Sequence, residues 1–213
     1  NRTKPFVYKP QFIRDGANGN GGGVGVLRSG KNDNQTCIVM KAGTQGMGHG
    51  HFDRLNVIFF DNNTEVLTDY GSARFLNVET KTGGGYTKEN DTWAKATIAH
   101  NTVTVDKTSH YKADWEEGEK SSPSLIYFDA NKNYQVVCAE ENKAYSDVKM
   151  LRTAILFQPQ GAESPLLLDV FKVRSYTEHQ YDLPFWYQGH LTNVNFKYKN
   201  NSTQLNTLGT KDG

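Results

Sequence analysis

The sequence lacks the features that would assign the chain to several specialised classes. It has no run of about eighteen apolar residues, so it predicts no membrane span, and it shows no signal-peptide pattern. Lys and Arg total 24, Asp and Glu total 23, and the resulting net charge of +1 gives no reason to expect a nucleic-acid partner. Because the chain starts at Asn1 without a methionine, we expect it to be an internal piece of a longer protein.

Cysteine is also scarce. Cys37 and Cys138 are the only two, and each lies inside a short apolar run. Cysteine in such a position behaves as a small core residue, so we expect two buried thiols. A disulfide is the alternative, and it requires that the two strands adjoin.

The residues that are present favour β structure. Tyr and Phe number 11 each, and the apolar segments are short and separated by turn residues, which is typical of strands. A chain of 213 residues is long enough for one sizeable domain. The predicted strands are 35–41, 55–60, 65–69, 102–106, 124–129, 134–140, 149–157, 166–174, 181–187 and 193–198, with one short helix near 88–96. This spacing predicts an all-β fold, an antiparallel β-sandwich.

The N-terminal part differs in composition. Segment 15–25 is rich in glycine and has little to bury, so we expect a loop there that is flexible or approaches a ligand. The apolar residues before it predict the end of a linker or a first edge strand. We therefore divide the chain into residues 1–34, a linker or edge strand with a Gly-rich loop, and residues 35–213, the β-sandwich domain.

Histidine provides the first indication of a site. His49 and His51 are separated only by Gly50, and in an extended segment side chains two residues apart point the same way. A Gly-rich turn with solvated histidines is the alternative for this pattern alone. Asp69 and His100 lie further along, and two histidines with a carboxylate are a common zinc set. The spacing matches no short metal motif, so such a site would be assembled from separate strands.

Several separate motifs, in order along the chain, carry a family resemblance. They are GHGHFDRL at 48–55, DYGSARF at 69–75, GGGY at 83–86, WAKATIAHNT at 93–102 and YDLPFWY at 181–187. The chain resembles the heparinase II/III-like domain, most closely that of the family 17 alginate lyases, over about residues 43–189. The resemblance implies an N-terminal α/α toroid followed by a C-terminal β-sandwich, to which this chain corresponds. The chain would then lack the toroid and the last strands of the sandwich.

The resemblance also implies a structural zinc ion held by His51, Asp69 and His100. If 61–64 is a hairpin turn, Asn56 stands opposite Asp69, and a straight strand would leave His51 roughly 16 Å away at about 3.3 Å per residue. The chain must therefore bend between residues 50 and 55 for the three side chains to meet. The other histidines receive structural interpretations: His110 as a surface or loop residue and His179 as a hydrogen-bonded edge residue.

The chemistry implied by the resemblance requires further residues. A lyase must remove the proton at C5 of a uronate, which becomes feasible when the neighbouring carboxylate is neutralised. His49 and Arg74 are the candidates for that role. A tyrosine, with an ordinary pKa of about 10, can act as base or acid beside positive charge, and Tyr86 stands where the family places an active-site tyrosine. The alternative is that 83–85 is a plain flexible loop.

We therefore expect part of an exo-type alginate (oligoalginate) lyase that cleaves 4-linked uronates by β-elimination and leaves an unsaturated uronate. The expected partners are an alginate oligosaccharide and the toroid of the same protein, and the expected location is the periplasm or the exterior of a bacterium. The isolated chain should be inactive, because the family draws an asparagine, a histidine and a second tyrosine from the toroid. The alternatives are a non-catalytic, zinc-stabilised module that binds acidic glycans, or a lyase for heparan sulfate or hyaluronan.

Overall fold

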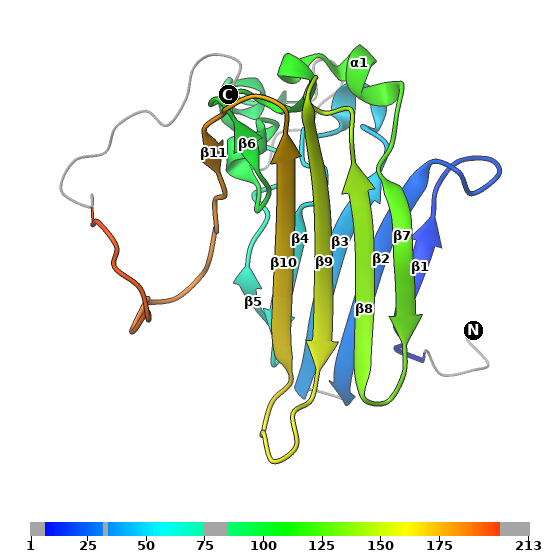
Figure 1. Ribbon diagram of the computed structural model, residues 1–213, viewed down its shortest axis with the longest axis vertical. Helices are drawn as coiled ribbons and strands as arrows, with labels where there is room; N and C mark the ends of the chain where they lie inside the picture. Colours follow the sequence, from blue (N-terminus) through cyan, green and yellow to red (C-terminus); the bar gives the residue numbers. More distant parts are fainter. Residues whose placement is uncertain (1–6, 32–33, 75–84, 201–213) are drawn as a thin grey trace.

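Two packed antiparallel sheets form the body of the protein (Figure 1). The computed structural model describes residues 7–31, 34–74 and 85–200. The five-stranded sheet has the order β1 (Gln11–Arg14), β2 (Gly22–Lys31), β3 (Asn34–Gly43), β4 (Val57–Asp61), β5 (Thr64–Leu67). The four-stranded sheet has the order β10 (Leu166–Ser175), β9 (Val148–Phe157), β8 (Tyr134–Glu141), β7 (Ser124–Ala130). The predicted antiparallel β-sandwich is confirmed.

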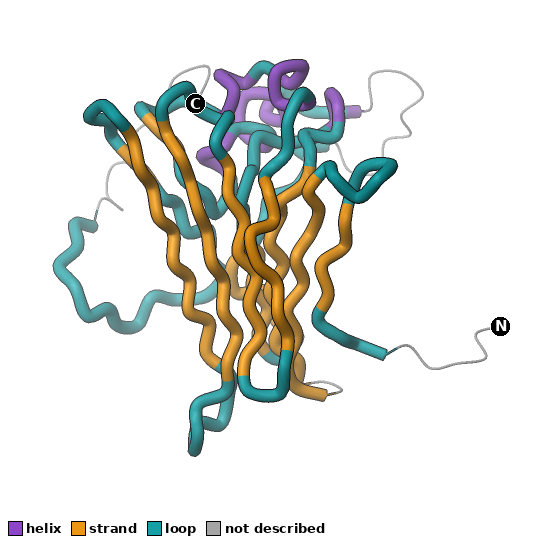
Figure 2. Tube along the Cα trace, turned by 45° about the vertical axis from the view of Figure 1, so that its right-hand side comes forward, coloured by secondary structure: helices purple, strands orange, loops and turns teal. Residues whose placement is uncertain are grey.

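Short helical turns gather at one end of the sandwich (Figure 2). They are η1 (Met47–His49), η3 (Asn90–Ala94), η4 (Thr97–Ala99), η5 (His110–Ala113) and α1 (Trp115–Glu119). A small third sheet pairs β6 (Thr104–Val105) with β11 (Tyr181–Asp182). The predicted short helix near 88–96 corresponds to η3, a single π-helical stretch. Among the described residues no helix has the length and apolar character needed to cross a membrane.

The hairpin of β4 and β5 has the predicted register only next to its turn, because beyond Phe60 the register shifts and Phe59 pairs with Leu67. Phe60 pairs with Glu65, and a bulge follows between Phe59 and Phe60. Asn62 and Asn63 both have positive φ, 47° and 58°, which is the geometry of a tight turn whose twist matches the flanking strands. Asn56 and Asp69 still lie at the same end of the hairpin, and their side chains are hydrogen-bonded to each other.

The glycine-rich segment differs from the prediction of a flexible loop. Only residues 15–21 form a loop, and from Gly22 the chain is β2, which pairs with β3 along its whole length. Glycine is disfavoured in isolated strands, but here the second sheet lies too close for a larger residue: a Cβ on Gly25 would sit 2.6 Å from Cγ2 of Val137. The preceding β1 is the edge strand of the same sheet. Strands on both sides of residue 34, the predicted boundary, therefore belong to one sheet.

Two predicted strands near the C-terminus are also different. Segment 181–187 contributes only β11 and an isolated bridge from Leu67 to Tyr187, because its backbone pairs irregularly with the edge beyond β5. Segment 193–198 is not a strand within the described residues. Phe196 and Tyr198 are 66% and 64% exposed there, and alternating apolar residues without a neighbouring strand have no ladder to join.

The core lies between the two sheets. Ile38 and Met40 of β3 pack there with Val137 of β8 and Met150 of β9, and all four are fully buried. Cys37 and Cys138 are buried free thiols on β3 and β8, which belong to different sheets, so the prediction of two thiols is confirmed. Burial raises the pKa of Cys37 and keeps the thiol protonated.

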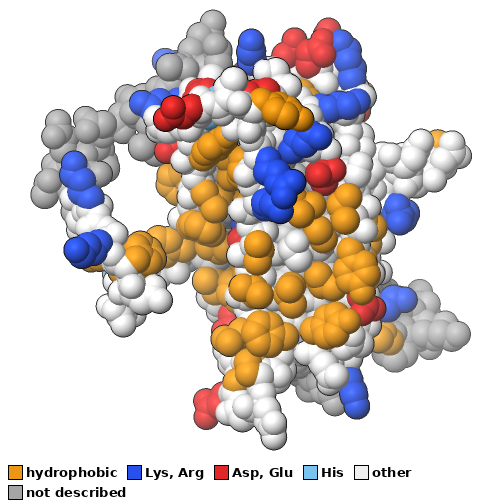
Figure 3. Space-filling model, in the orientation of Figure 1, with side chains coloured by type: hydrophobic (Ala, Val, Ile, Leu, Met, Phe, Trp, Pro, Cys, Tyr) orange, Lys and Arg blue, Asp and Glu red, His pale blue; other side chains and the backbone are white. Residues whose placement is uncertain are grey.

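The outer face of the four-stranded sheet is unusually apolar. On β10, Leu166, Leu168 and Val170 are 52%, 48% and 48% exposed. Their neighbours on that face continue across the sheet through the registered pairs Leu166–Phe157 and Leu168–Ile155. Figure 3 shows hydrophobic side chains over much of this face, with Lys and Arg gathered towards the helical end. A water-facing antiparallel sheet normally presents polar residues, so this sheet has two apolar faces.

Candidate metal centre and active site

The loop between β3 and β4 makes the bend that the zinc hypothesis required. Gly50 follows η1, and a Cβ there would overlap the carbonyl oxygen of Gln45, so only glycine fits. Leu55 takes a left-handed conformation with φ of 60°, and the Asn56 amide donates to the Asp53 carbonyl at 3.0 Å. Segment 50–56 is therefore a compact turn that precedes β4 and brings residue 51 back over the hairpin end.

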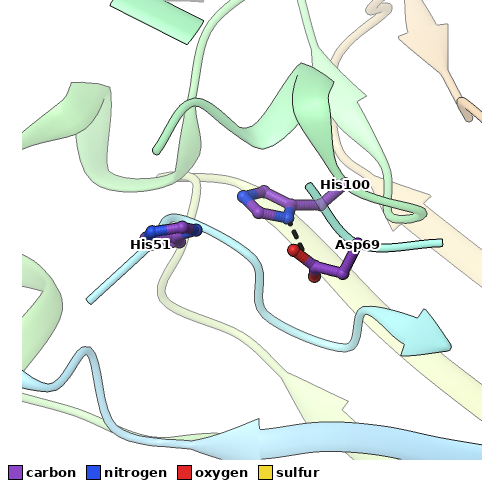
Figure 4. A group of neighbouring side chains, drawn as sticks. All are labelled: His51, Asp69 and His100. Carbon is purple, nitrogen blue, oxygen red and sulfur yellow. Dashed lines mark hydrogen bonds and ion pairs between the residues drawn. The ribbon is translucent and has the colours of Figure 1, made fainter. Parts of the chain in front are cut away.

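The three predicted ligands lie together (Figure 4). One donor atom from each of His51, Asp69 and His100 can be chosen so that all lie within 4.8 Å of one another. His100 Nδ1 is 3.1 Å from Asp69 Oδ2, and the centroids of the two imidazole rings are 5.2 Å apart. Each residue comes from a different loop: after η1, after β5 and after η4. Among the described residues this is the only such cluster of three or more candidate ligands.

The electrostatics of the cluster favour the metal-binding forms. Burial lowers the pKa of His51, and the nearby His100 lowers it further, so His51 is a neutral imidazole near pH 7. Burial alone would raise the pKa of Asp69, but the hydrogen bonds from His100 and the Gly71 amide more than offset it, and the pKa is lowered overall. The cluster therefore presents a carboxylate and imidazole nitrogens.

Two asparagines hold these ligands in place. Asn56 Nδ2 donates to Asp69 Oδ2, and Asn56 Oδ1 accepts the amide of Asn101 at 2.9 Å. Asn101 Nδ2 in turn donates to the Val57 and Thr68 carbonyls at 3.0 and 2.9 Å. This network connects the residue before Asp69 with the residue after His100, so both ligands are oriented from behind.

Two fully buried arginines anchor the same loops from below. Arg152 of β9 makes two hydrogen bonds with Asp169, at 2.9 and 2.6 Å, and donates from Nη1 to the Leu55 carbonyl at 2.8 Å and to the Asn101 carbonyl. It thereby links the four-stranded sheet to the loops on either side of the cluster. No sequence motif indicated Arg152, although a charged residue inside the apolar run 149–157 was an available signal.

Arg54 plays the matching role on the other side of the loop. Its guanidinium donates to the Gly43 carbonyl and to the carbonyls of Gly118 and Ser121, at 2.6 and 3.0 Å for the last two. Glu141, also buried, lies 3.8 Å from Arg54 Nε. The arginine of the 48–55 motif is therefore a structural residue that ties β3, α1 and the following turn together.

The residues at the cluster fit a zinc ion. His100 Nε2 is buried and has no hydrogen-bond partner, and an unsatisfied buried polar atom of this kind requires an explanation. Two imidazoles and one carboxylate are a donor set that zinc accepts, with ligand distances of about 2.0–2.2 Å. One donor atom from each of the three side chains already lies within 4.8 Å of the others, so one ion could be shared among them.

The predicted catalytic residues lie on two different elements. Arg74 and Tyr86 form an isolated backbone bridge, and the Arg74 guanidinium lies 5.2 Å from the centre of the Tyr86 ring. His49 is exposed on η1, two residues before His51. The structure thus brings Arg74 and Tyr86 into contact and places His49 on a separate loop. Of the motifs, residues 75, 83 and 84 lie outside the described part of the chain.

The other two histidines with structural interpretations are both enclosed by partners. His110 is completely buried rather than a surface residue: its Nδ1 accepts the Arg54 amide and its Nε2 bonds the Val103 carbonyl. Burial lowers its pKa to about 3, so it is neutral. His179 is a hydrogen-bonded edge residue as expected, held between Asp106 at 2.6 Å and Asp147 at 3.0 Å.

Comparison with known proteins agrees with the fold and the motifs. Residues 14–212 match the family described as Heparinase II/III-like, C-terminal. An alginate lyase of Stenotrophomonas maltophilia is 42% identical over 213 residues, and an exo-oligoalginate lyase of Saccharophagus degradans is 40% identical over 211. The chain spans 29% of the length of each of these relatives.

Solved structures with the same fold are more distant in sequence. A heparinase III gene product superposes with a TM-score of 0.64 at 20% identity, over 88% of this chain and 25% of that one. A heparan sulfate lyase from Pedobacter heparinus gives a TM-score of 0.54 at 20% identity, over 71% of this chain and 21% of that one. From the family match across nearly its whole length, the chain belongs to the heparinase II/III-like, C-terminal domain family.

Proposed function

We propose that this chain is the β-sandwich part of an exo-type alginate (oligoalginate) lyase, which acts in the periplasm or outside a bacterial cell. The observation that carries the proposal is the 42% identity, over the entire chain, with a protein named alginate lyase. The second relative, named exo-oligoalginate lyase, supports the exo-type action. The contact between Arg74 and Tyr86 supports an elimination reaction, because it places a cation beside a group that can transfer a proton.

The proposed reaction is a β-elimination that needs no second reactant. The proton at C5 of a uronate leaves, its electron pair forms the C4–C5 double bond, and the C4–oxygen bond breaks while the leaving oxygen takes up a proton. Arg74 pairs with the uronate carboxylate and stabilises the charge that develops on it. His49 hydrogen-bonds the same carboxylate, and Tyr86 transfers a proton.

We also propose that His51, Asp69 and His100 hold a structural zinc ion. When bound, the ion cross-links three loops and contributes its binding free energy to folding. Asn56 and Asn101 then orient Asp69, and Arg152 fixes the backbone on both sides. The rigid base keeps the His49 loop in position. Metal analysis of protein purified without chelator is expected to find one zinc per chain, and an all-oxygen metal such as calcium in its place would contradict the assignment.

The rest of the longer protein is proposed to supply the opposite wall of the cleft. The relatives are more than three times as long as this chain, since it spans 29% of them. An N-terminal α/α toroid that faces Arg74 and Tyr86 would exclude water and complete the proton-transfer groups. Low dielectric then strengthens the effect of Arg74 on the developing charge.

Assay of the full-length protein tests the proposed activity. Alginate, heparan sulfate and hyaluronan are each incubated with the enzyme, and the ultraviolet absorbance of the new double bond is recorded. Activity is expected on alginate, and Tyr86→Phe should reduce it by about a hundredfold or more, within the range for a lost proton-transfer group. Tyr176→Phe is the matched control, because Tyr176 is 85% exposed and has no role in the proposed reaction. Cleavage of heparan sulfate or hyaluronan instead would replace the proposed substrate.

A further inference from the structure

A cavity of about 220 Å³ opens beside the loop that carries His49. The residues that line it include Gly48, Gly50, Phe52, Lys95 and Trp115. Ligand pockets for drug-sized molecules are about 300–1,000 Å³, so this smaller cavity suits a single sugar ring. None of the residues already assigned to metal binding or proton transfer lines it.

Trp115 is held at this cavity with its ring accessible. It is 44% exposed, and among the described tryptophans it alone is strongly exposed, since Trp93 and Trp186 pack against each other with ring centroids 5.1 Å apart. Asp114 caps the helix that starts at Trp115 by accepting the amides of Glu116 and Glu117 at 2.9 and 3.1 Å. An aromatic ring fixed at the edge of a pocket is a platform on which the C–H face of a sugar can stack.

The turn before Trp115 is strained, which shows that its position is imposed by the fold. Tyr111, Lys112 and Ala113 have consecutive positive φ values of 57°, 54° and 60°. Residues other than glycine rarely adopt this left-handed backbone conformation, and such strain persists only where surrounding contacts stabilise it. Here the Tyr111 amide donates to the Ala144 carbonyl at 2.8 Å, and its hydroxyl bonds Glu141 at 3.2 Å.

The cavity wall and the His49 loop form one rigid unit. Glu119, the last residue of α1, accepts hydrogen bonds from the amides of Gly46 and Met47 at 2.9 and 3.0 Å. On the other side, the Phe52 amide donates to the Lys95 carbonyl at 2.9 Å. A sugar held on Trp115 would therefore lie at a fixed distance from His49.

The charges at the cavity match a uronate. Lys95 Nζ lies 2.9 Å from Asp91, whose side chain is 76% exposed, and exposed pairs of this kind are weak. The ammonium group can therefore pair with a second carboxylate, and Asp91 can accept hydrogen bonds from sugar hydroxyls. A ring platform, a cation and a hydroxyl acceptor are the groups that a single uronate residue requires.

We propose that this cavity is a binding subsite for a uronate that lies beyond the two residues flanking the cleaved bond, with Trp115 stacking on the ring and Lys95 pairing with its carboxylate. The proposal rests on the proposed lyase function. It explains why an exposed tryptophan is held next to the His49 loop, and it makes Trp115 and Lys95 determinants of oligosaccharide length.

The test uses the full-length enzyme with alginate disaccharide and tetrasaccharide. Trp115→Ala is expected to raise KM for the tetrasaccharide about tenfold, while KM for the disaccharide stays near the wild-type value. Trp115→Phe should retain most of the tetrasaccharide affinity. Lys95→Met should weaken tetrasaccharide binding and reduce its salt dependence. Tyr176→Ala is the control for loss of an exposed aromatic residue, and melting temperatures establish that each variant is folded.

Calorimetric binding to the Tyr86→Phe variant separates this subsite from the chemistry. Tetrasaccharide affinity that falls with Trp115→Ala in that background supports the subsite, even if the wild-type enzyme proves to cleave another polymer. Equal tetrasaccharide affinity and equal KM in Trp115→Ala and wild type would overturn the subsite while leaving the lyase function intact. An equal loss for disaccharide and tetrasaccharide would also overturn it, because the cavity would then belong to the cleavage position itself.

Discussion

At the scale of single residues, the buried and unpaired Nε2 of His100 distinguishes the metal cluster from an ordinary hydrogen-bonded group. His100 is fully buried, and its other nitrogen already contacts Asp69. Leaving a polar atom of this kind unsatisfied costs about 1–3 kcal/mol. A bound ion would remove that cost. The roles of His51, a proposed ligand, and His49, a proposed substrate-binding residue, can therefore be distinguished by their separate effects on stability and activity.

His51→Ala is expected to reduce stability, whereas His49→Ala should reduce activity. His51 is part of the ligand cluster, so its loss should cost about 2–4 kcal/mol and lower the melting temperature of this domain. His49 is exposed, so its replacement should change stability by no more than about 0.5 kcal/mol while reducing turnover about 10²-fold or more. Calorimetry and the absorbance assay on the full-length enzyme measure both effects. Similar melting temperatures for the two variants would show that the roles are wrongly divided.

His179 provides a pH-dependent link between three loops. Hydrogen bonds to Asp106 and then Asp147 raise the pKa of His179 above 6.5. The hydrogen bond from His179 is the main cause that lowers the pKa of Asp106, whereas the pKa of Asp147 is lowered first by the Thr177 hydroxyl and then by His179. The stability that protonated His179 contributes is therefore fully present at pH values below its pKa in the unfolded chain, and it is lost as pH rises through the raised pKa of the folded state. The contribution of the carboxylates is lost as pH falls below about 4. NMR titration should give a His179 pKa above 6.5, and Asp106→Asn should return it towards 6.5; an unchanged value would contradict this origin.

The sequence predicted individual site residues only where a motif carried them. His51, Asp69 and His100 were expected together, and the structure brings them together. Arg152 and Asn56 were not predicted, because their roles depend on backbone carbonyls and side chains contributed by loops distant in sequence. Hydrophobic patterning identifies the strand that contains Arg152, but it does not indicate which carbonyls the arginine will reach.

At the scale of secondary-structure elements, β9 acts as the support for the metal loops. We expect Arg152→Met to destabilise the protein by about 3–5 kcal/mol, because it leaves Asp169 without its partner and removes donors from two loop carbonyls. Chemical denaturation measures the loss. Lys149→Met on the same strand is the control, and because Lys149 is exposed it should have little effect. The double variant Arg152→Met, Asp169→Leu should recover part of the stability, and no recovery would indicate that the carbonyl contacts dominate.

Strands in which apolar and polar residues alternate, and strands made of apolar runs, were predicted within a few residues of their observed ends. β8, β9 and β10 are examples, since each is long and packs one face against the core. β2 was not predicted, because its glycines favour a loop and the contacts that make them necessary, such as Val137 against Gly25 and the Ala42 carbonyl against Gly22, come from other strands. Segment 193–198 shows the converse, because its alternation is that of a strand but no neighbour among the described residues pairs with it. Both differences arise from tertiary context that local sequence does not contain.

At the scale of the whole molecule, we expect this chain by itself to show no lyase activity. In the proposed active site, Arg74, Tyr86 and His49 would line only one wall, and a uronate bound there would be open to water on its other side. High dielectric weakens the stabilisation of developing charge, and the groups supplied by the longer protein would be missing. The absorbance assay on the purified chain measures this directly. Elimination that persists in Tyr86→Phe would show that the active site has been placed wrongly.

The two apolar faces of the four-stranded sheet determine how this chain should behave in a test tube. Leu166, Leu168 and Val170 give the face the character of an inner layer, so the purified chain should bind a hydrophobic dye and scatter more light as its concentration rises. Leu168→Lys should raise the solubility limit with little loss of stability, because that side chain is half exposed, whereas Leu167→Lys on the core side should unfold the protein. A chain that stays monomeric and dye-free at high concentration would contradict this expectation. If the apolar face does cause association, aggregation will limit work with the separated domain. A variant with a charged residue on that face would then be the practical form for crystallisation and spectroscopy.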